Sequence, residues 1–282
     1  MSADGVRNPE DFCYRHPDRR SYVLCQRCLR TICPECQTQG AVGVICPECM
    51  KAQRAETPRP VRRARAAARA MSDRPLVTYW IVGITVALFV LDYIPGLDLT
   101  TAFVFNSVFL DPASGFPFQP WRVFTPLVVH AGIWHVGLNM LAVWMIGRSL
   151  EPLLGHVRFV VLYVLSGLAG SAAVALLAPG TFVVGASGAV FGLLGAILVI
   201  GRHIGANITG ILIIVGINLI MGFLPGFSIS WQAHVGGLVA GALAGLIFAR
   251  TRHADQRGLQ YGLLAGLAVV LLALCAVPAL VG

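Results

Sequence analysis

The sequence predicts an all-α, polytopic membrane protein that carries a small hydrophilic domain at its N-terminus. Of its 282 residues, 56% are hydrophobic and only 12% are charged. The mean hydropathy of +0.74 lies outside the usual range for a soluble globular protein. The polar residues are concentrated in the first 75 positions. The chain therefore divides into a hydrophilic head and a long apolar body.

Seven apolar stretches of the body predict membrane-spanning helices, because a span must cross about 30 Å of hydrocarbon. The fourth stretch is short for a span, so we expect its N-terminal end to stop below the membrane surface, in a pocket formed by its neighbours. The seven stretches are residues 76–94, 132–150, 158–177, 187–201, 208–224, 231–249 and 259–281.

Most arginines of the body lie in or next to every second connection between the predicted helices, on the same side as the basic segment before the first helix. Two opposite connections, 178–186 and 225–230, carry no charge, and the long opposite connection, 95–131, has only Asp98, Asp111 and Arg122. By the positive-inside rule, we expect a cytosolic N-terminus and an extracytoplasmic C-terminus. The arginines that decide this orientation are Arg148, Arg158, Arg202, Arg250, Arg252 and Arg257.

Residues 51–75 form a strongly basic linker with Lys51 and seven arginines against Glu56 and Asp73. Directly before a membrane span, such a segment fixes orientation and touches anionic lipid headgroups. Because polybasic charge alone is not specific, nucleic-acid binding through the linker and head is the weaker interpretation. Lys51 is the single lysine of an Arg- and Ala-rich chain. That usage suggests a GC-rich bacterial genome, and hence a bacterial plasma membrane.

Seven of the eight cysteines lie between Cys13 and Cys49, with no apolar signal segment before them. We expect this head to stay in the reducing cytosol, where close Cys pairs are metal ligands more often than disulfides. Four ligand pairs with x2 spacing give eight ligands, enough for two tetrahedral zinc ions. The pairs are Cys13 with His16, Cys25 with Cys28, Cys33 with Cys36, and Cys46 with Cys49.

The head is too small to bury enough core to fold alone, so metal binding should supply its folding free energy. If alternating pairs close around each ion, 13/16 with 33/36 and 25/28 with 46/49, the head would resemble the cross-braced B-box fold. Sequential pairing is the alternative. Coordination by protein ligands alone leaves no open position for catalysis. We therefore expect the head to bind a cytosolic protein partner or to regulate the body.

Polar side chains within membrane spans are costly, so they indicate a function or a packed polar contact. Gly185-Ala-Ser187-Gly188 begins the fourth predicted span. His234 lies in the sixth on a stripe with Gly237, Gly241 and Gly245, which would let a neighbouring helix approach closely. His135 and Asn139 share one face of the second span. Each set, taken alone, can be explained by helix packing or interhelical hydrogen bonds.

Together, the three sets fit one chemical need. A serine is a poor nucleophile unless a base takes its proton, and histidine has a suitable pKa near neutral pH. The oxyanion that follows needs preorganised donors. Ser187 would lie at a helix N-terminus, where backbone N–H groups lack intrahelical partners. His135 and Asn139 would add side-chain donors.

At these residues the chain resembles the rhomboid family of intramembrane serine proteases over about residues 76–250. The resemblance implies a dyad of Ser187 and His234 without an acidic third member, with Gly185 and Gly188 supporting it. Phe191, where many relatives have Tyr, would orient the imidazole by stacking. The motifs that carry the resemblance are Gly185–Gly188, Ala233-His-Val-Gly-Gly237, His135-x3-Asn139 and Trp121-Arg122.

The resemblance also implies structural roles outside the dyad. Trp121 and Arg122 would anchor the outer loop, a role that also suits an interfacial aromatic with a snorkelling arginine. Glu151 would stabilise the cytosolic turn after the second helix. The seventh helix is an addition to the six-helix core, and we assign it no chemistry.

The sequence thus predicts a zinc-binding B-box-like domain (1–50), an Arg-rich linker (51–75), a rhomboid core of six transmembrane helices (76–250) and a seventh transmembrane helix (251–282). The expected activity is hydrolysis of a peptide bond in or next to a substrate's transmembrane segment, near the extracytoplasmic face. The partners are then membrane-protein substrates and the lipid bilayer, and catalysis needs no cofactor. The alternative is a non-catalytic rhomboid-like protein that binds membrane helices for dislocation or trafficking.

Overall fold

The computed structural model describes residues 8–40, 43–56, 74–203, 205–224 and 229–281. The chain divides into two compact units, Met1–Met71 and Ser72–Gly282. The predicted linker lies mostly outside the described residues, at 57–73. Each unit is described by itself.

The first unit, the head, contains two small antiparallel sheets, β1–β2 and β3–β4, and one helix. Its buried core consists of five cysteines and Ile32. A core of this size stabilises little on its own, so the head needs a further source of folding free energy. The elements are β1 (Phe12–Cys13), β2 (His16–Arg20), β3 (Thr38–Gln39), β4 (Val44–Ile45) and α1 (Pro47–Glu56).

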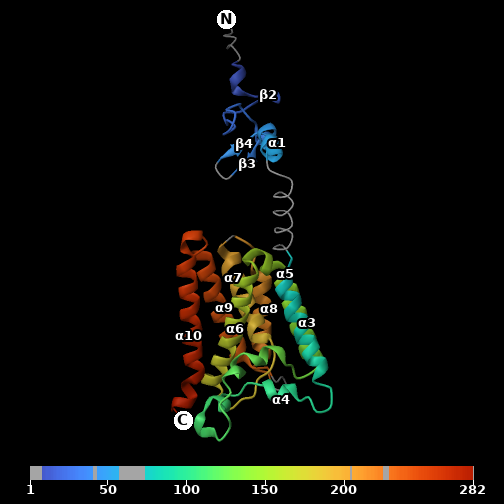
Figure 1. Cartoon of the computed structure of the whole chain (residues 1–282), viewed down its shortest axis with the longest axis vertical. Helices are drawn as coiled ribbons and strands as arrows, with labels where there is room; N and C mark the ends of the chain where they lie inside the picture. Colours follow the sequence, from blue (N-terminus) through green and yellow to red (C-terminus); the bar gives the residue numbers. More distant parts are fainter. Residues whose placement is uncertain (1–7, 41–42, 57–73, 204, 225–228, 282) are drawn as a thin grey trace. The chain divides into compact units, whose positions relative to one another are not determined.

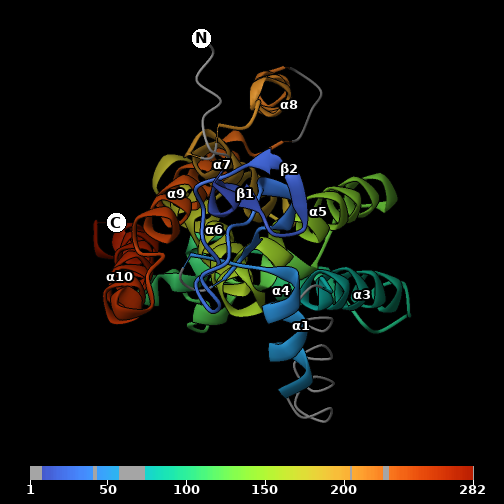
Figure 2. The same ribbon diagram turned by 90° about the horizontal axis from the view of Figure 1, so that it is seen from above.

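The second unit is an up-and-down array of helices, and each of the seven predicted apolar stretches coincides with one of them (Figure 1). The predicted fold class, a helical polytopic membrane protein, is confirmed. Seen along the bundle, α3, α8 and α10 lie at the periphery (Figure 2). The helices are α3 (Leu76–Leu91), α5 (Ile133–Leu154), α6 (His156–Leu177), α7 (Ser187–His203), α8 (Thr209–Met221), α9 (Trp231–Arg250) and α10 (Arg257–Val281).

Among the described helices, three are both long and apolar enough to span a membrane: α6, α9 and residues Arg257–Pro278 of α10. The helices α3, α7 and α8 are apolar but shorter. Although α5 has 22 residues, it is less apolar, because it carries His135, Asn139, Arg148 and Glu151. Of these polar residues, His135 and Asn139 are candidate site residues, and Glu151 is a predicted structural residue.

The helices α7 and α9 pack with their backbones in contact. A Cβ atom on Gly237 would lie 1.9 Å from the carbonyl oxygen of Gly188, and one on Gly241 would lie 2.0 Å from that of Gly192. Only glycine permits this approach. The glycine stripe of α9 therefore faces α7, as its spacing predicts, and brings the N-terminal ends of both helices together.

The connection between α3 and α5 is long and ordered, and Arg122 is buried within it. Its Nε donates to Oε1 of Gln119 at 2.7 Å, and Nη1 donates to the carbonyls of Thr101 and Val104 at 2.9 and 2.8 Å. The guanidinium also lies 4.0 Å from the ring centroid of Phe109. Arg122 therefore holds together two parts of this connection, which includes α4 (Leu99–Phe103). Because its guanidinium is buried in the folded loop, Arg122 is not a snorkelling side chain.

Glu151, near the end of α5, is fully buried. Its carboxylate accepts hydrogen bonds from the backbone N–H groups of Val77 and Thr78 at 2.9 and 2.8 Å, and from Oγ1 of Thr78 at 2.6 Å. Nδ1 of His156 lies 2.5 Å from Oε1 of the same carboxylate. Glu151 thus does more than stabilise the turn to α6, because it also satisfies the free N–H groups at the start of α3.

The additional helix α10 is held to the core by a buried polar side chain. Oε1 of Gln260 accepts from Nε of Arg158 in α6 at 2.8 Å. Its Nε2 donates to the carbonyl and hydroxyl oxygens of Thr251, just after α9, at 2.9 and 2.7 Å. This one amide therefore fixes α10 against both neighbouring helices.

Candidate active site

Three helices, α5, α7 and α9, begin at the same end of the bundle, and each carries a candidate residue near its start (Figure 1). Ser187 is the first residue of α7. The loop before it is held in place by an antiparallel bridge between Phe105 and Val183, and by a hydrogen bond from the Gly185 N–H to the Pro126 carbonyl at 2.8 Å. The outer connection therefore determines where Ser187 lies.

His234 stands on the first turn of α9 and is buried. Its imidazole stacks on the ring of Phe191, with centroids 4.0 Å apart and an interplanar angle of 12°. Phe191 lies four residues after Ser187, one turn along α7, so the stack fixes the imidazole beside the helix that carries the serine. Both Ser187 and His234 belong to the described residues, and no hydrogen bond joins their side chains in this structure.

His234 also lacks the third member of a triad. Nδ1 of its ring is buried, and no described residue forms a hydrogen bond with it. The imidazole is therefore oriented by aromatic stacking, where a triad would use a carboxylate. Nε2 is left as the ring nitrogen that can serve Ser187.

His135, on the first turn of α5, contacts the loop before Ser187. Its Nδ1 accepts a hydrogen bond from the Ala131 N–H at 3.4 Å, which assigns the ring proton of a neutral imidazole to Nε2. A Cβ atom on Gly185 would lie 2.6 Å from that Nε2. Gly185 also has a φ of +112°, a conformation that side chains rarely adopt. Gly185 thus leaves the space in which His135 can approach.

Asn139 lies one turn further along α5 and is buried. Its Nδ2 donates to the carbonyl of His135 at 2.9 Å. Since an amide group carries two N–H donors, one remains after this bond. His135 and Asn139 therefore lie on one face, as predicted, but Asn139 is partly committed to its own helix.

His130 is a site residue that the sequence reasoning missed. It is buried beside His135, with ring centroids 5.0 Å apart. Its Nε2 accepts from the Ala186 N–H at 3.3 Å, directly before Ser187. A second histidine five residues before His135 was the signal that could have drawn attention to it.

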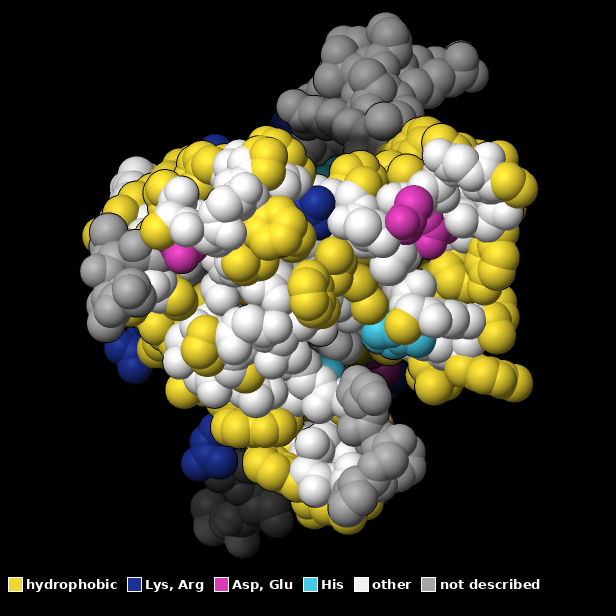
Figure 3. Space-filling view, turned by 90° about the horizontal axis from the view of Figure 1, so that it is seen from below, with side chains coloured by type: hydrophobic (Ala, Val, Ile, Leu, Met, Phe, Trp, Pro, Cys, Tyr) yellow, Lys and Arg dark blue, Asp and Glu magenta, His cyan; other side chains and the backbone are white. Residues whose placement is uncertain are grey.

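A cavity of about 20 Å³ lies next to Ser187. That is room for about one water molecule. Figure 3 shows the end of the bundle at which α5, α7 and α9 begin, where histidine side chains border a hollow. The cavity is lined by Pro126, Leu127, Gly167, Gly170, Ser171, Val183, Gly185, Ser187, Gly188 and Ala233.

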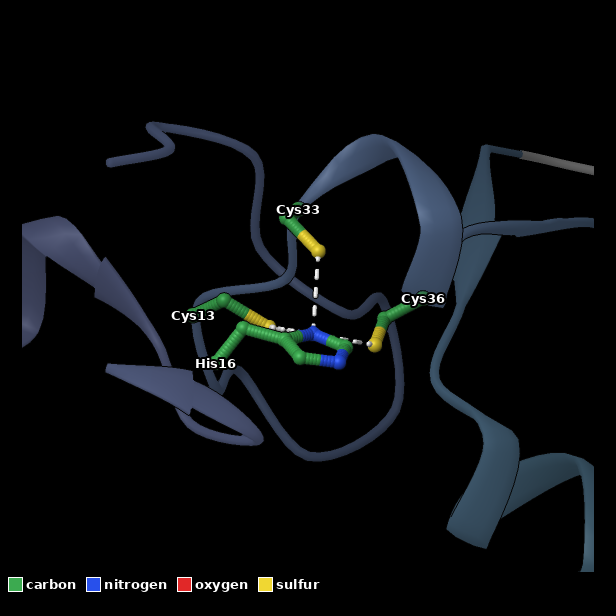
Figure 4. Close-up of side chains that lie close together, drawn as sticks. All are labelled: Cys13, His16, Cys33 and Cys36. Carbon is green, nitrogen blue, oxygen red and sulfur yellow. Dashed lines mark hydrogen bonds between the residues drawn. The ribbon is translucent and has the colours of Figure 1, made fainter. Parts of the chain in front are cut away.

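In the head, the eight predicted ligands gather in two clusters, Cys13/His16/Cys33/Cys36 and Cys25/Cys28/Cys46/Cys49. These are the alternating pairs and not the sequential ones. Within each cluster, the ligand atoms lie within 4.8 Å of one another. In the first, the sulfurs of Cys13, Cys33 and Cys36 surround Nδ1 of His16 at 3.8, 3.3 and 3.4 Å (Figure 4). These donors and distances fit tetrahedral coordination of one metal ion per cluster.

The thiols of the first cluster have divergent pKa values. Burial would raise the pKa of Cys13, but hydrogen bonds to the backbone of Cys33 and Arg15 outweigh it and lower the pKa to about 6. Burial, together with the thiols of Cys13 and Cys33, raises the pKa of Cys36 to about 11. Thiolates so close together repel each other, and a divalent cation would remove that repulsion.

Comparison with known proteins agrees with the geometry of the second unit. Residues 117–251 match the family model of the rhomboid domain. The chain is 35% identical over 187 residues to the rhomboid protease GluP of Bacillus subtilis, and the alignment covers 61% of this chain and 35% of GluP. It is 41% identical over 138 residues to RHOMBOID-like protein 1 of Arabidopsis thaliana, and that alignment covers 46% of this chain and 35% of the plant protein.

A third relative is the putative rhomboid protease YdcA of Bacillus subtilis, 36% identical over 129 residues, which covers 44% of this chain and 64% of that protein. The chain spans about a third of the length of the first two relatives. The matched region contains Ser187 and His234 together with His135 and Asn139. Residues 117–251 are therefore similar to the rhomboid domain, and these relatives together with the apolar helices support a multi-pass membrane protein.

Proposed function

We propose that the chain is an intramembrane serine endopeptidase in which Ser187 and His234 form a catalytic dyad. The observation that carries this proposal is the stack of His234 on Phe191. It places the only imidazole of α9 against the helix that begins with Ser187. Gly185 and Gly188 support the dyad, because they allow His135 and α9 to approach the serine.

In the proposed reaction, His234 Nε2 takes the proton of Ser187 Oγ as that oxygen attacks the carbonyl carbon of the scissile bond. The oxyanion accepts hydrogen bonds from Nε2–H of His135, from the remaining N–H of Asn139 and from backbone N–H groups at the start of α7. His234 then gives its proton to the leaving amine. A water molecule, for which the cavity has room, hydrolyses the acyl-enzyme by the same steps.

The substrates would be transmembrane segments of membrane proteins, cleaved near the extracytoplasmic face. This follows from the position of Ser187 at the end of the bundle opposite to the connections that carry most of the arginines, together with the positive-inside rule. The N-terminus would then be cytosolic and the C-terminus extracytoplasmic, in a bacterial plasma membrane. The present cavity is too small for a peptide, so substrate must open the site as it binds.

We also propose that each of the two clusters in the head holds a structural zinc ion, in a B-box-like arrangement. The support is the number and softness of the donors, since cysteine thiolates with a histidine select zinc. All four positions would be filled by protein ligands. The ions would stabilise the head and would take no part in proteolysis.

Labelling with a fluorophosphonate or isocoumarin probe tests the dyad directly. We expect the probe to modify Ser187 in purified wild-type protein. Ser187→Ala and His234→Ala should each abolish both labelling and cleavage of a model transmembrane substrate, and the double variant should be no worse, because the two residues act as a unit. Ser114→Ala, in the outer connection, is the matched control and should keep full activity.

A probe adduct elsewhere, or substantial turnover by Ser187→Ala, would remove the assignment. If wild-type protein neither reacted with the probe nor cleaved the substrate, yet bound membrane helices, the non-catalytic rhomboid-like alternative would be favoured.

A further inference from the structure

The exposed larger apolar side chains of the head are confined to one short segment. Among described residues 8–40 and 43–56, these side chains are Tyr22, Val23, Leu24 and Leu29, with exposed fractions of 76%, 40%, 48% and 69%. A domain this small has few apolar residues to use for its core. Because these exposed side chains all lie within eight consecutive residues, 22–29, they indicate a binding surface.

Backbone hydrogen bonds fold this segment into a hairpin. Leu24 bridges Thr31 in antiparallel fashion, and the Ile32 N–H donates to the carbonyl of Val23 at 2.8 Å. The turn between them contains Cys25 and Cys28 of the second cluster, and Cys25 N–H donates to the carbonyl of Arg30 at 2.9 Å. We call residues 22–32 the apolar hairpin. Its shape is maintained by the cluster, so its side chains are presented in a preformed arrangement.

Leu29 occupies this turn at an energetic cost. Its φ of +59° makes it the one non-glycine residue with positive φ among those that the structure describes. Glycine or asparagine would suit this left-handed conformation better. A strained residue that is also apolar and exposed serves neither the turn nor the core. This combination points to a role in contact with another apolar phase.

The apolar hairpin and its flanks are rich in arginine. Residues 19–34 contain four arginines and no carboxylate. Arg19 pairs with Glu35, and Arg30 pairs with Glu48. Arg20 precedes the first arm of the hairpin and Arg27 lies in its turn, and both are exposed. Apolar side chains bordered by arginines match an anionic bilayer interface, where headgroups are negative and the acyl boundary is apolar.

The tether of the head keeps this surface near a bilayer. The head joins α3 through residues 57–73, which carry five arginines and one aspartate. Seventeen residues reach at most about 60 Å, so the head cannot leave the membrane surface by more than this. Such a tether makes docking intramolecular and raises the effective concentration of lipid.

We propose that the apolar hairpin docks the head onto the anionic lipid surface, with Tyr22, Val23, Leu24 and Leu29 inserted at the headgroup boundary and Arg20 and Arg27 contacting lipid phosphates. The head is then a membrane-binding module of the cytosolic leaflet. This inference is independent of the proposed proteolysis, because it concerns only the head and the bilayer.

Photo-crosslinking in proteoliposomes tests this docking on the full chain. Tyr22→p-benzoylphenylalanine should form lipid adducts, detected by mass spectrometry, in vesicles that contain phosphatidylglycerol. The same probe at Thr38, which is exposed on β3, is the matched control and should give few. Since each basic residue near an anionic surface contributes about fivefold, the lipid adducts should fall severalfold in pure phosphatidylcholine vesicles or in high salt.

A second variant separates docking from folding. Leu29→Asp should reduce the lipid adduct at position 22 severalfold, whereas Thr38→Asp makes the same charge change and should not. The metal content of both variants should equal that of wild type, which shows that the head is intact. The proposal is overturned if position 22 crosslinks to polypeptide, or if its lipid adducts do not exceed those at position 38 or do not depend on lipid charge.

Discussion

The ring of Phe191 and the imidazole of His234 lie almost parallel, with centroids 4.0 Å apart. Burial removes the imidazole from water, and no described residue bonds its Nδ1. The stack is therefore the principal contact that sets the ring's orientation. In a triad, a carboxylate would do this and would also stabilise the imidazolium, whereas an aromatic face supplies orientation alone.

Phe191→Ala should lower kcat and should also destabilise the bundle by about 3–5 kcal/mol, because Phe191 is buried. Loss of an aromatic pair costs about 1 kcal/mol beyond the buried area, and a freed imidazole would spend less time facing Ser187, so we expect about a tenfold fall in kcat. Phe191→Tyr keeps the ring and should stay close to wild type. Cleavage of a model transmembrane substrate, measured beside thermal unfolding in detergent, checks this. Unchanged turnover by the alanine variant would contradict the orienting role.

Glu151→Ala should destabilise the bundle strongly. The substitution leaves two backbone N–H groups and a hydroxyl of α3 without their acceptor, and each unpaired buried group costs about 1–3 kcal/mol. Glu151→Gln keeps one acceptor oxygen and should lose less. Thermal unfolding should rank wild type above Gln above Ala. If the Ala and Gln variants unfolded together with wild type, the cap on α3 would contribute little.

Glu151 and Phe191 illustrate what the sequence could and could not predict. Phe191 and Ser187 share a helix, so their common face followed from a spacing of four residues. Helix positions followed from apolar runs, whose ends are also local features. The contact of Glu151 with Thr78 joins residues 73 positions apart. No local pattern specifies which helix start a carboxylate will cap.

The same limit explains His130 and Arg122. The bond of His130 to the Ala186 N–H depends on how the outer connection folds over the loop before Ser187. Arg122 looks like a snorkelling side chain in sequence, but carbonyls of Thr101 and Val104 converge on it only in the folded loop. In contrast, the candidate metal ligands of the head could be predicted from their x2 spacing, because both members of such a pair can reach one ion.

Metal analysis should find two zinc ions per chain. Cys33→Ser removes a ligand of the first cluster and should lower the content to about one, because the two clusters share no ligand. Cys275→Ser is the matched control, since Cys275 lies in α10 and outside both clusters, and it should keep two. Chelation should unfold the head and leave the helical signal of the membrane unit. One ion in wild type, or two in Cys33→Ser, would refute the assignment of two four-ligand sites.

The last prediction separates the oxyanion donors from the dyad, since donors contribute by degree whereas the nucleophile and base are required. Losing one donor costs about 100- to 1,000-fold in kcat. His135→Ala should approach the upper end, because Nε2 of His135 is aimed at the loop before Ser187 and its ring also bonds the Ala131 N–H. Asn139→Ala should lie nearer the lower end, because one of its N–H groups already bonds the His135 carbonyl.

Both variants should retain substrate affinity and turnover above the Ser187→Ala background. They should also react with a serine-directed probe more slowly than wild type, because Ser187 and His234 remain in place. Single-turnover kinetics with the model substrate, run beside the probe reaction, measures both effects. If the two variants cleaved substrate at wild-type rates, His135 and Asn139 would be interhelical contacts only. The oxyanion would then be stabilised only by backbone N–H groups at the start of α7, because only those in the first turn of a helix lack intrahelical partners.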